Sequence, residues 1–292
     1  MLIHKDETIR NVVRIEEDKR GPSIVLFSGV HGDEVSGIHA VEKVFFDFFT
    51  GARTLQQGSL TLVRANEQAI EAERRYVQHN LNRLFKADYG ADIDRASYEF
   101  CRAQELKTIL QNCDYFLDLH SAPTAQEPFI VVEHENAGFF SQLGIPKLMT
   151  GWSKFSSDAI GGDAENYANA HGARSATLES GSHFDKRSND VAYRAVISFL
   201  SVLGVVVGNQ APTSNPLEIV DVYAVVTKDF DDFRYARQAE NFQFVKKGEA
   251  FAFQGGRPLT AHEDTYVLIP MKPEETKLRE EVCYLGRRVQ AA

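Results

Sequence analysis

Residues 23–34 read SIVLFSGVHGDE, a short apolar run that stops at a polar turn containing glycine. An apolar run of this length, with β-branched and aromatic residues, is typical of a strand buried on both faces. Over residues 36–49 the apolar side chains recur at steps of three and four, which predicts an amphipathic helix. Strand, turn and helix in this order form the repeating unit of α/β proteins.

The same unit recurs further along the chain. Three more apolar runs predict strands, at residues 59–63, 114–119 and 175–178, and helical periodicity predicts helices at residues 95–110 and 189–206. Strands that alternate with helices favour a largely parallel sheet covered by helices on both faces.

The last part of the chain has a different pattern. Residues 209–216, NQAPTSNP, are polar and contain two prolines, which predicts a linker. Short β-type runs separated by turn residues follow, at residues 217–226, 250–253, 265–269 and 282–285. We therefore expect two domains, an α/β domain over residues 1–210 and a small all-β domain over residues 211–292.

The composition excludes several classes of protein. The 292 residues are 43% hydrophobic and 25% charged, as in an ordinary globular protein, and the formal net charge of −9 argues against nucleic-acid or membrane-surface partners. No apolar run approaches the ~18 residues of a membrane span. The three scattered cysteines form no pair at zinc-ligand or redox spacing, and the N-terminus lacks a signal-peptide pattern, so we expect a cytoplasmic protein. Homo-oligomerisation is left open.

Three side chains are candidate metal ligands. His31 and Glu34 lie in the turn after the first predicted strand, and His120 follows the strand over residues 114–119. The carboxyl ends of parallel strands line the ligand crevice of an open sheet, so the three side chains are expected to meet there. Two histidines and one carboxylate leave a fourth position for water, which is the pattern of a catalytic zinc site.

Three further polar residues are candidates for catalysis and substrate binding. Glu179 follows the strand over residues 175–178, where a carboxylate can act as general base on a zinc-activated water. The fork of Arg83 matches a substrate carboxylate, and Asn82 beside it can add a hydrogen bond. Arg83 belongs to a basic stretch over residues 66–83. The alternative interpretation of this stretch is a solvated helix in which acidic side chains balance the arginines, and this interpretation is preferred for Arg74.

Four motifs occur in a fixed order over roughly residues 25–185: GVHGDE at 29–34, Asn66 with RRY at 74–76 and NLNR at 80–83, DLHS at 118–121, and LESG at 178–181. Together they resemble the succinylglutamate desuccinylase and aspartoacylase family of zinc hydrolases, which is related to the zinc carboxypeptidases. The resemblance implies a zinc-carboxypeptidase-like fold, with a mixed, largely parallel sheet flanked by helices in the catalytic domain and a C-terminal β domain.

The resemblance also implies residue roles. One zinc ion per chain would be bound by His31, Glu34 and His120, with Glu179 as general base. Arg75 would polarise the scissile carbonyl, and Asn82 and Arg83 would bind the α-carboxylate of the amino-acid part.

The chain departs from the family at some positions. Family members commonly have an acidic residue where this chain has Asn80, so the surroundings of the substrate-binding arginine are expected to differ. Some members supply a tyrosine from the C-terminal domain, and either Tyr266, Tyr284 or neither corresponds to it.

We therefore expect a zinc-dependent amidohydrolase that cleaves a small, carboxylate-bearing N-acyl amino acid with metal-activated water. A metallocarboxypeptidase acting on peptides is the first alternative, because it would use the same metal ligands and bind the substrate carboxylate in the same way. A metal-containing binding protein without catalysis is the second, although a pure binder has no need of Glu179 beside an open metal position.

Overall fold

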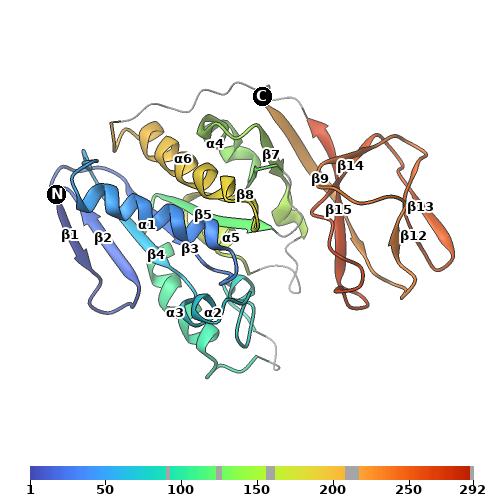
Figure 1. Cartoon of the computed structure of the whole chain (residues 1–292), viewed down its shortest axis with the longest axis horizontal. Helices are drawn as coiled ribbons and strands as arrows, with labels where there is room; N and C mark the ends of the chain where they lie inside the picture. The colour runs from blue at the N-terminus through green and yellow to red at the C-terminus, as the bar shows by residue number, and fades with distance from the viewer. Residues whose placement is uncertain (90–92, 123–126, 156–161, 208–216, 290–292) are drawn as a thin grey trace.

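The computed structural model describes all residues except 90–92, 123–126, 156–161, 208–216 and 290–292. In the described part of the chain, one mixed 12-stranded sheet has the order β1-β2-β4-β3-β5-β8-β6-β7-β9-β15-β14-β11, and a second sheet has the order β10-β12-β13. The first sheet runs through the whole molecule, from the N-terminal strands to the C-terminal ones (Figure 1).

Four parallel strands form the centre of this sheet, in the order β4-β3-β5-β8. They are β3 (Ser23–Ser28), β4 (Ser59–Arg64), β5 (Tyr115–Ala122) and β8 (Arg174–Ser182). All four confirm strands predicted from the sequence. Since β5 and β8 are longer than predicted, His120 and Glu179 lie inside these strands and not in the loops after them.

Antiparallel and shorter strands extend the centre on both sides. On one side, β1 (Leu2–Lys5) pairs with β2 (Val12–Glu16), and β2 pairs with β4. On the other side, β6 (Phe129–Val132) runs antiparallel to β8 and parallel to β7 (Lys147–Thr150). These four strands were not predicted, because runs of four or five residues carry too little periodicity to stand out.

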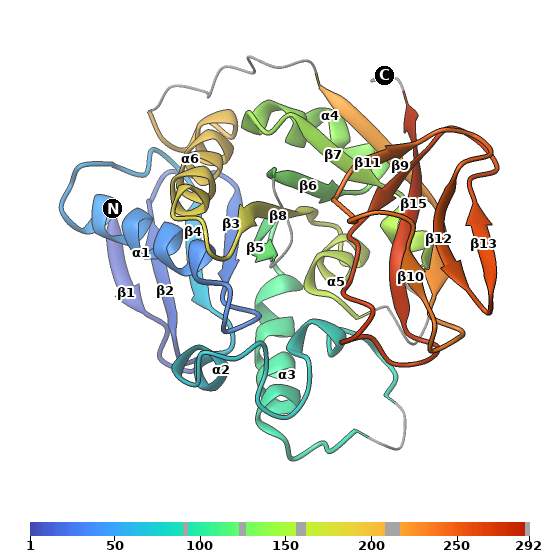
Figure 2. The ribbon, with the colours of Figure 1, turned by 45° about the vertical axis from the view of Figure 1, so that its right-hand side comes forward.

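Helices cover both faces of the central strands, as predicted (Figures 1 and 2). On one face, α1 (Val35–Phe49) and α6 (Arg187–Val202) pack together, and on the other lie α3 (Tyr98–Leu110) and α5 (Ala164–Ala170). Shorter helical segments complete the connections: α2 (Glu67–Glu71), α4 (Ala137–Phe140), η1 (Leu81–Arg83), η2 (His134–Asn136), η3 (Ser141–Leu143) and η4 (Trp152–Phe155). Among the described residues, no helix combines the length and the apolar character that crossing a bilayer requires.

Each face of the sheet has its own apolar core. Val44, Phe48 and Phe199 belong to the core under α1 and α6, whereas Phe27, Leu106 and Phe116 belong to the core under α3. This arrangement explains why the central strands are apolar on both faces.

The C-terminal region consists of strands, as predicted. They are β9 (Glu218–Thr227), β10 (Arg234–Tyr235), β11 (Gln243–Val245), β12 (Ala250–Gln254), β13 (Arg257–Thr260), β14 (Thr265–Leu268) and β15 (Glu281–Val289). β9 joins them to the main sheet, because it pairs in parallel with β7 and antiparallel with β15. The predicted linker and the predicted boundary between residues 210 and 211 lie outside the described residues, so the division into two domains stays a prediction.

Candidate active site

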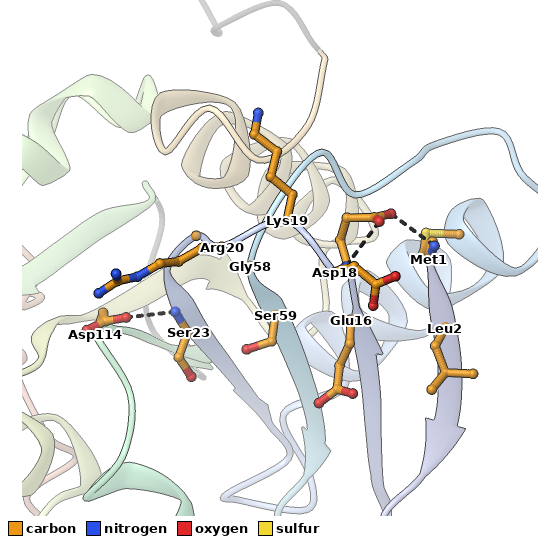
Figure 3. Close-up of a pocket in the computed structure, with 12 residues that line it drawn as sticks. Met1, Leu2, Glu16, Asp18, Lys19, Arg20, Ser23, Gly58, Ser59 and Asp114 are labelled. Atoms are coloured by element: carbon orange, nitrogen blue, oxygen red, sulfur yellow. Dashed lines mark hydrogen bonds and ion pairs between the residues drawn. The ribbon is translucent and has the colours of Figure 1, made fainter.

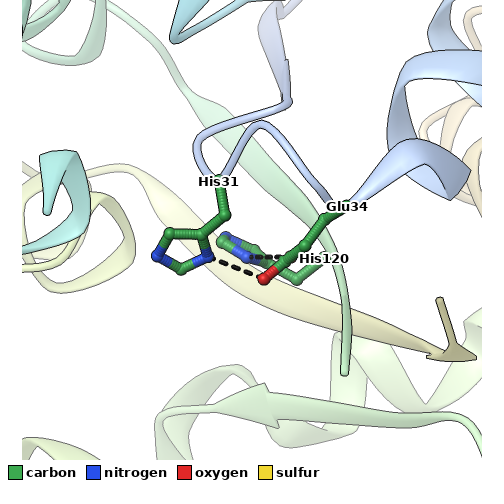
Figure 4. Close-up of side chains that lie close together, drawn as sticks. All are labelled: His31, Glu34 and His120. Atoms are coloured by element: carbon green, nitrogen blue, oxygen red, sulfur yellow. Dashed lines mark hydrogen bonds and ion pairs between the residues drawn. The ribbon is translucent and has the colours of Figure 1, made fainter. Parts of the chain in front are cut away.

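Three side chains converge at the carboxyl edge of the central strands (Figure 4). Nδ1 of His31 lies 2.8 Å from Oε1 of Glu34, and Nδ1 of His120 lies 2.8 Å from Oε2 of the same carboxylate. One ligand atom from each of the three residues lies within 4.8 Å of the others. The three side chains are almost fully buried, with exposed fractions of 4%, 2% and 3% in chain order. The structure thus brings together the predicted metal ligands.

The turn that carries His31 and Glu34 is packed against the loop after β4. Asn66 fixes this contact, because its backbone N–H donates to the carbonyl oxygen of Gly29 and its side chain accepts from Ala69 at the start of α2. Gly32 lies directly against the same segment, where a Cβ atom would be 2.1 Å from the carbonyl carbon of Ala69. Only a residue without a side chain fits this position.

Each histidine of the cluster has a partner for its second nitrogen. Nε2 of His31 lies 3.1 Å from Oδ1 of Asn80, and Nε2 of His120 lies 2.9 Å from Oδ2 of Asp118. The second pair is close enough for an ion pair, although its angles fall outside those of a hydrogen bond. Partners of this kind fix the orientation of metal-binding histidines.

The electrostatics of the cluster favour a bound cation. Burial lowers the pKa of His31 to about 4, so its ring is neutral at pH 7. Burial alone would raise the pKa of Glu34, but the two adjacent histidines hold it well below its usual range, and the side chain is a carboxylate. If Nε2 of His31 carries the proton that Asn80 accepts, Nδ1 and the carboxylate face each other as two acceptors. A cation between them removes this conflict.

Glu179 lies beside the cluster on the neighbouring strand. It is paired in register with His120, and its buried Oε2 has no hydrogen-bond partner among the described residues. Burial, and next the charge of Glu34, raise the pKa of Glu179 to about 8. A carboxyl group whose pKa lies near the working pH, beside such a cluster, has the properties of a general acid or base.

Arg75 reaches the cluster from the loop that follows α2. Its Nη1 donates to Oε1 of Glu34 at 3.1 Å, and its side chain is 47% exposed. Glu99, which is fully buried in the first turn of α3, holds this loop in place. Its carboxylate accepts hydrogen bonds from three successive backbone N–H groups, those of residues 77–79.

Asn82 and Arg83 lie in η1, which begins directly after Asn80. Oδ1 of Asn82 accepts from the backbone N–H of Ala164 at the start of α5, so the amide nitrogen is the group left for a ligand. Nη1 of Arg83 donates to the carbonyl oxygen of Asn82. The structure therefore gives Asn82 a structural bond that the sequence did not predict.

The two candidate tyrosines differ in environment. The hydroxyl of Tyr266 donates to Glu218 on β9. Tyr284 is fully buried on β15, its ring packs against Trp152, and its hydroxyl has no hydrogen-bond partner in the described part of the chain. Among the described residues, neither tyrosine bonds to His31, Glu34 or His120, so a contribution of Tyr266 or Tyr284 to the site stays a prediction.

Four residues near the cluster were not predicted from the sequence to contribute to the site. Asp118 could have been found, because it lies two residues before His120 and therefore on the same face of the strand. Asn80 lies near the substrate-binding arginine, as expected, because its carbonyl oxygen accepts from the backbone N–H of Arg83; its side chain also contacts His31, which was not predicted. Ser121 and His183 form a hydrogen bond of 2.8 Å, and the backbone N–H of Ser121 donates to Glu34. Such contacts depend on the tertiary fold and leave no signal in the sequence.

A surface hollow elsewhere on the sheet is a weaker candidate for the functional site (Figure 3). It lies at the amino ends of the strands, between the N-terminus, the segment over residues 16–21 and Asp114, and Asp114 is bonded to the backbone of Ser23. Because ligands of open α/β sheets bind at the carboxyl ends of the strands, the His31–Glu34–His120 cluster is the better candidate.

Fold and cluster together define a class of protein: a mixed α/β protein with a buried His–Glu–His cluster, the ligand set of catalytic zinc sites, at the carboxyl edge of its sheet. The family model for the succinylglutamate desuccinylase/aspartoacylase catalytic domain matches residues 20–202. The chain belongs to this family.

Curated relatives agree with this assignment. A succinylglutamate desuccinylase of Vibrio vulnificus is 25% identical, with 91% of this chain and 84% of that protein covered. One of Pseudoalteromonas atlantica is 26% identical, over 86% of this chain and 76% of its own length.

Solved structures share the fold. The succinylglutamate desuccinylase of Vibrio cholerae has a TM-score of 0.79 at 20% identity, covering 98% of this chain and 90% of that one. An ectoine utilization protein of Ruegeria pomeroyi has a TM-score of 0.72 at 19% identity, covering 98% of this chain and 92% of that one.

Proposed function

We propose that this protein is a zinc-dependent amidohydrolase that cleaves the amide bond of a small N-acyl amino acid. The observation that carries the proposal is the His31–Glu34–His120 cluster, with Oε2 of Glu179 buried beside it and without a hydrogen-bond partner among the described residues. Membership of the desuccinylase/aspartoacylase family and the names of the relatives support an amide-cleaving reaction.

The cluster would hold one zinc ion through the Nδ1 atoms of the two histidines and the carboxylate of Glu34. Zinc bound there would supply Lewis acidity, which makes water a nucleophile near neutral pH. Glu179 takes a proton from the attacking water and delivers it to the leaving nitrogen. Arg75, which is half exposed, stabilises the negative charge that develops on the carbonyl oxygen.

Substrate binding falls to Asn82 and Arg83. The guanidinium of Arg83 binds the α-carboxylate of the amino-acid part, and the amide nitrogen of Asn82 adds one donor. The substrate is thus expected to be a small N-acyl amino acid with a free carboxylate. Since the relatives are bacterial desuccinylases and the chain is acidic, we also expect the protein to act in the cytoplasm, without a nucleic-acid or membrane partner.

A substrate panel on protein of measured metal content tests the proposal. The panel contains N-succinyl, N-acetyl and N-formyl amino acids together with short peptides, and each is assayed with and without a chelator. Chelator-sensitive release of the free amino acid is the expected result. Cleavage of peptides alone would favour the metallocarboxypeptidase, and bound metal without any hydrolysis would favour the binding protein.

A further inference from the structure

The two histidines of the cluster differ in the group that holds their second nitrogen. His120 faces the carboxylate of Asp118, whose buried oxygens accept no hydrogen bond from the residues that the structure describes. His31 faces the carboxamide of Asn80, which carries no charge. The candidate metal site is therefore asymmetric in its surroundings, although its two histidine ligands are alike.

The orientation of the Asn80 side chain follows from a second contact. Oδ1 of Asn80 accepts a hydrogen bond of 3.0 Å from the backbone N–H of Asn82, so this atom is the oxygen and not the nitrogen of the amide. Because an oxygen accepts, the 3.1 Å contact to Nε2 of His31 requires the proton on Nε2. The lone pair of Nδ1 then points at the carboxylate of Glu34, which is 2.8 Å away.

We propose that Asn80 is a positioning residue that aims Nδ1 of His31 at the metal through an uncharged hydrogen bond, which makes His31 the weaker of the two histidine ligands. A carboxylate partner raises the basicity of a metal-binding histidine, and a neutral amide does so less. The inference rests on the proposed metal site but does not depend on the proposed reaction or substrate.

Substitutions at Asn80 can separate its contact with the backbone of Asn82 from its contact with His31. Asn80 is the N-cap of η1, and serine and aspartate are also good N-caps. In Asn80→Ser the short side chain can still cap η1 but cannot reach His31. In Asn80→Asp both contacts remain and the partner of His31 becomes a carboxylate.

The test measures metal affinity without any substrate. Apo forms of the wild type, Asn80→Ser and Asn80→Asp are titrated with zinc against a chromophoric chelator, and the visible spectrum of bound cobalt is recorded for each. Asn112→Asp, at an exposed position after α3, makes the same change in charge away from the cluster and serves as the control. Thermal unfolding of the apo proteins checks that each variant is folded.

We expect Asn80→Ser to raise the Kd for zinc by about 10- to 100-fold and Asn80→Asp to lower it below the wild-type value. The cobalt spectrum should change in both, and Asn112→Asp should match the wild type. Equal Kd values for the wild type and folded Asn80→Ser would overturn the role of Asn80 and leave the proposed function standing. A wild type that binds no zinc would overturn both proposals.

Discussion

His120 and Glu179 lie opposite each other on the neighbouring parallel strands β5 and β8, in direct register. His120 belongs to the candidate metal cluster, and Glu179 has a buried carboxylate oxygen without a hydrogen-bond partner among the described residues. The ladder between β5 and β8 fixes their relative position, so the proposed metal ligand and the proposed base are placed by the core of the sheet and not by a mobile loop.

Replacement of this base gives the most direct prediction. Glu179→Gln keeps the size of the side chain and removes its ability to take a proton, so kcat should fall by about 10²- to 10⁴-fold. The zinc content should stay that of the wild type, since Glu179 is not a proposed ligand. Turnover at the wild-type rate on a substrate that the wild type cleaves would show that Glu179 is not the base. Glu135→Gln, at an exposed position, is the control.

Arg83 should act on substrate binding more than on chemistry. Arg83→Lys keeps the charge but loses the planar fork that binds a carboxylate through two hydrogen bonds. The loss of such a bond is worth about 1.5–3 kcal/mol, so KM should rise by about 10- to 100-fold while kcat changes little. Steady-state kinetics give both numbers. The same change at the exposed Arg74 should leave KM unaltered, and an equal effect at both positions would speak against a specific carboxylate site.

The turn before α1 should tolerate no side chain at Gly32. In Gly32→Ala the new methyl group would meet the backbone of Ala69, which cannot move away as a flexible side chain could. We expect a loss of about 1–3 kcal/mol in the free energy of unfolding and a lower zinc affinity, because His31 shifts with the turn. Denaturant unfolding and zinc titration measure the two effects.

Gly138 offers a matched control for this variant. A Cβ atom at Gly138 would meet none of the described residues within 4 Å, so Gly138→Ala should be neutral or stabilising. If the two alanine variants have the same stability, the close packing at Gly32 does not constrain the turn.

The sequence predicted the central strands and the main helices because their apolar patterns are long and regular. It also predicted which side chains form the cluster, since parallel strands bring their carboxyl ends together. It could not predict the irregular pairing after His120, where the N–H of Ser121 donates to Glu34. Nor could it place Asn80 against His31, because that contact joins two loops that are 49 residues apart in the chain.

Glu165 should make the stability of the protein depend on pH. Its side chain is 4% exposed on α5, and burial, together with the nearby Asp163, raises its pKa well above that of an exposed glutamate. The carboxyl group therefore stays protonated in the folded protein at pH values where the unfolded chain has released the proton. The stabilisation is complete below about pH 4.5 and is lost as the pH rises toward the folded-state pKa.

Glu165→Gln removes this dependence, because an amide does not ionise and its oxygen can still accept the hydrogen bond from Thr177. The difference in unfolding free energy between the variant and the wild type should grow in favour of the variant above pH 5, by at most about 1.4 kcal/mol per pH unit. Urea unfolding at a series of pH values with saturating zinc measures it. Glu135→Gln should run parallel to the wild type, and a Glu165→Gln curve that does the same would show that Glu165 ionises normally.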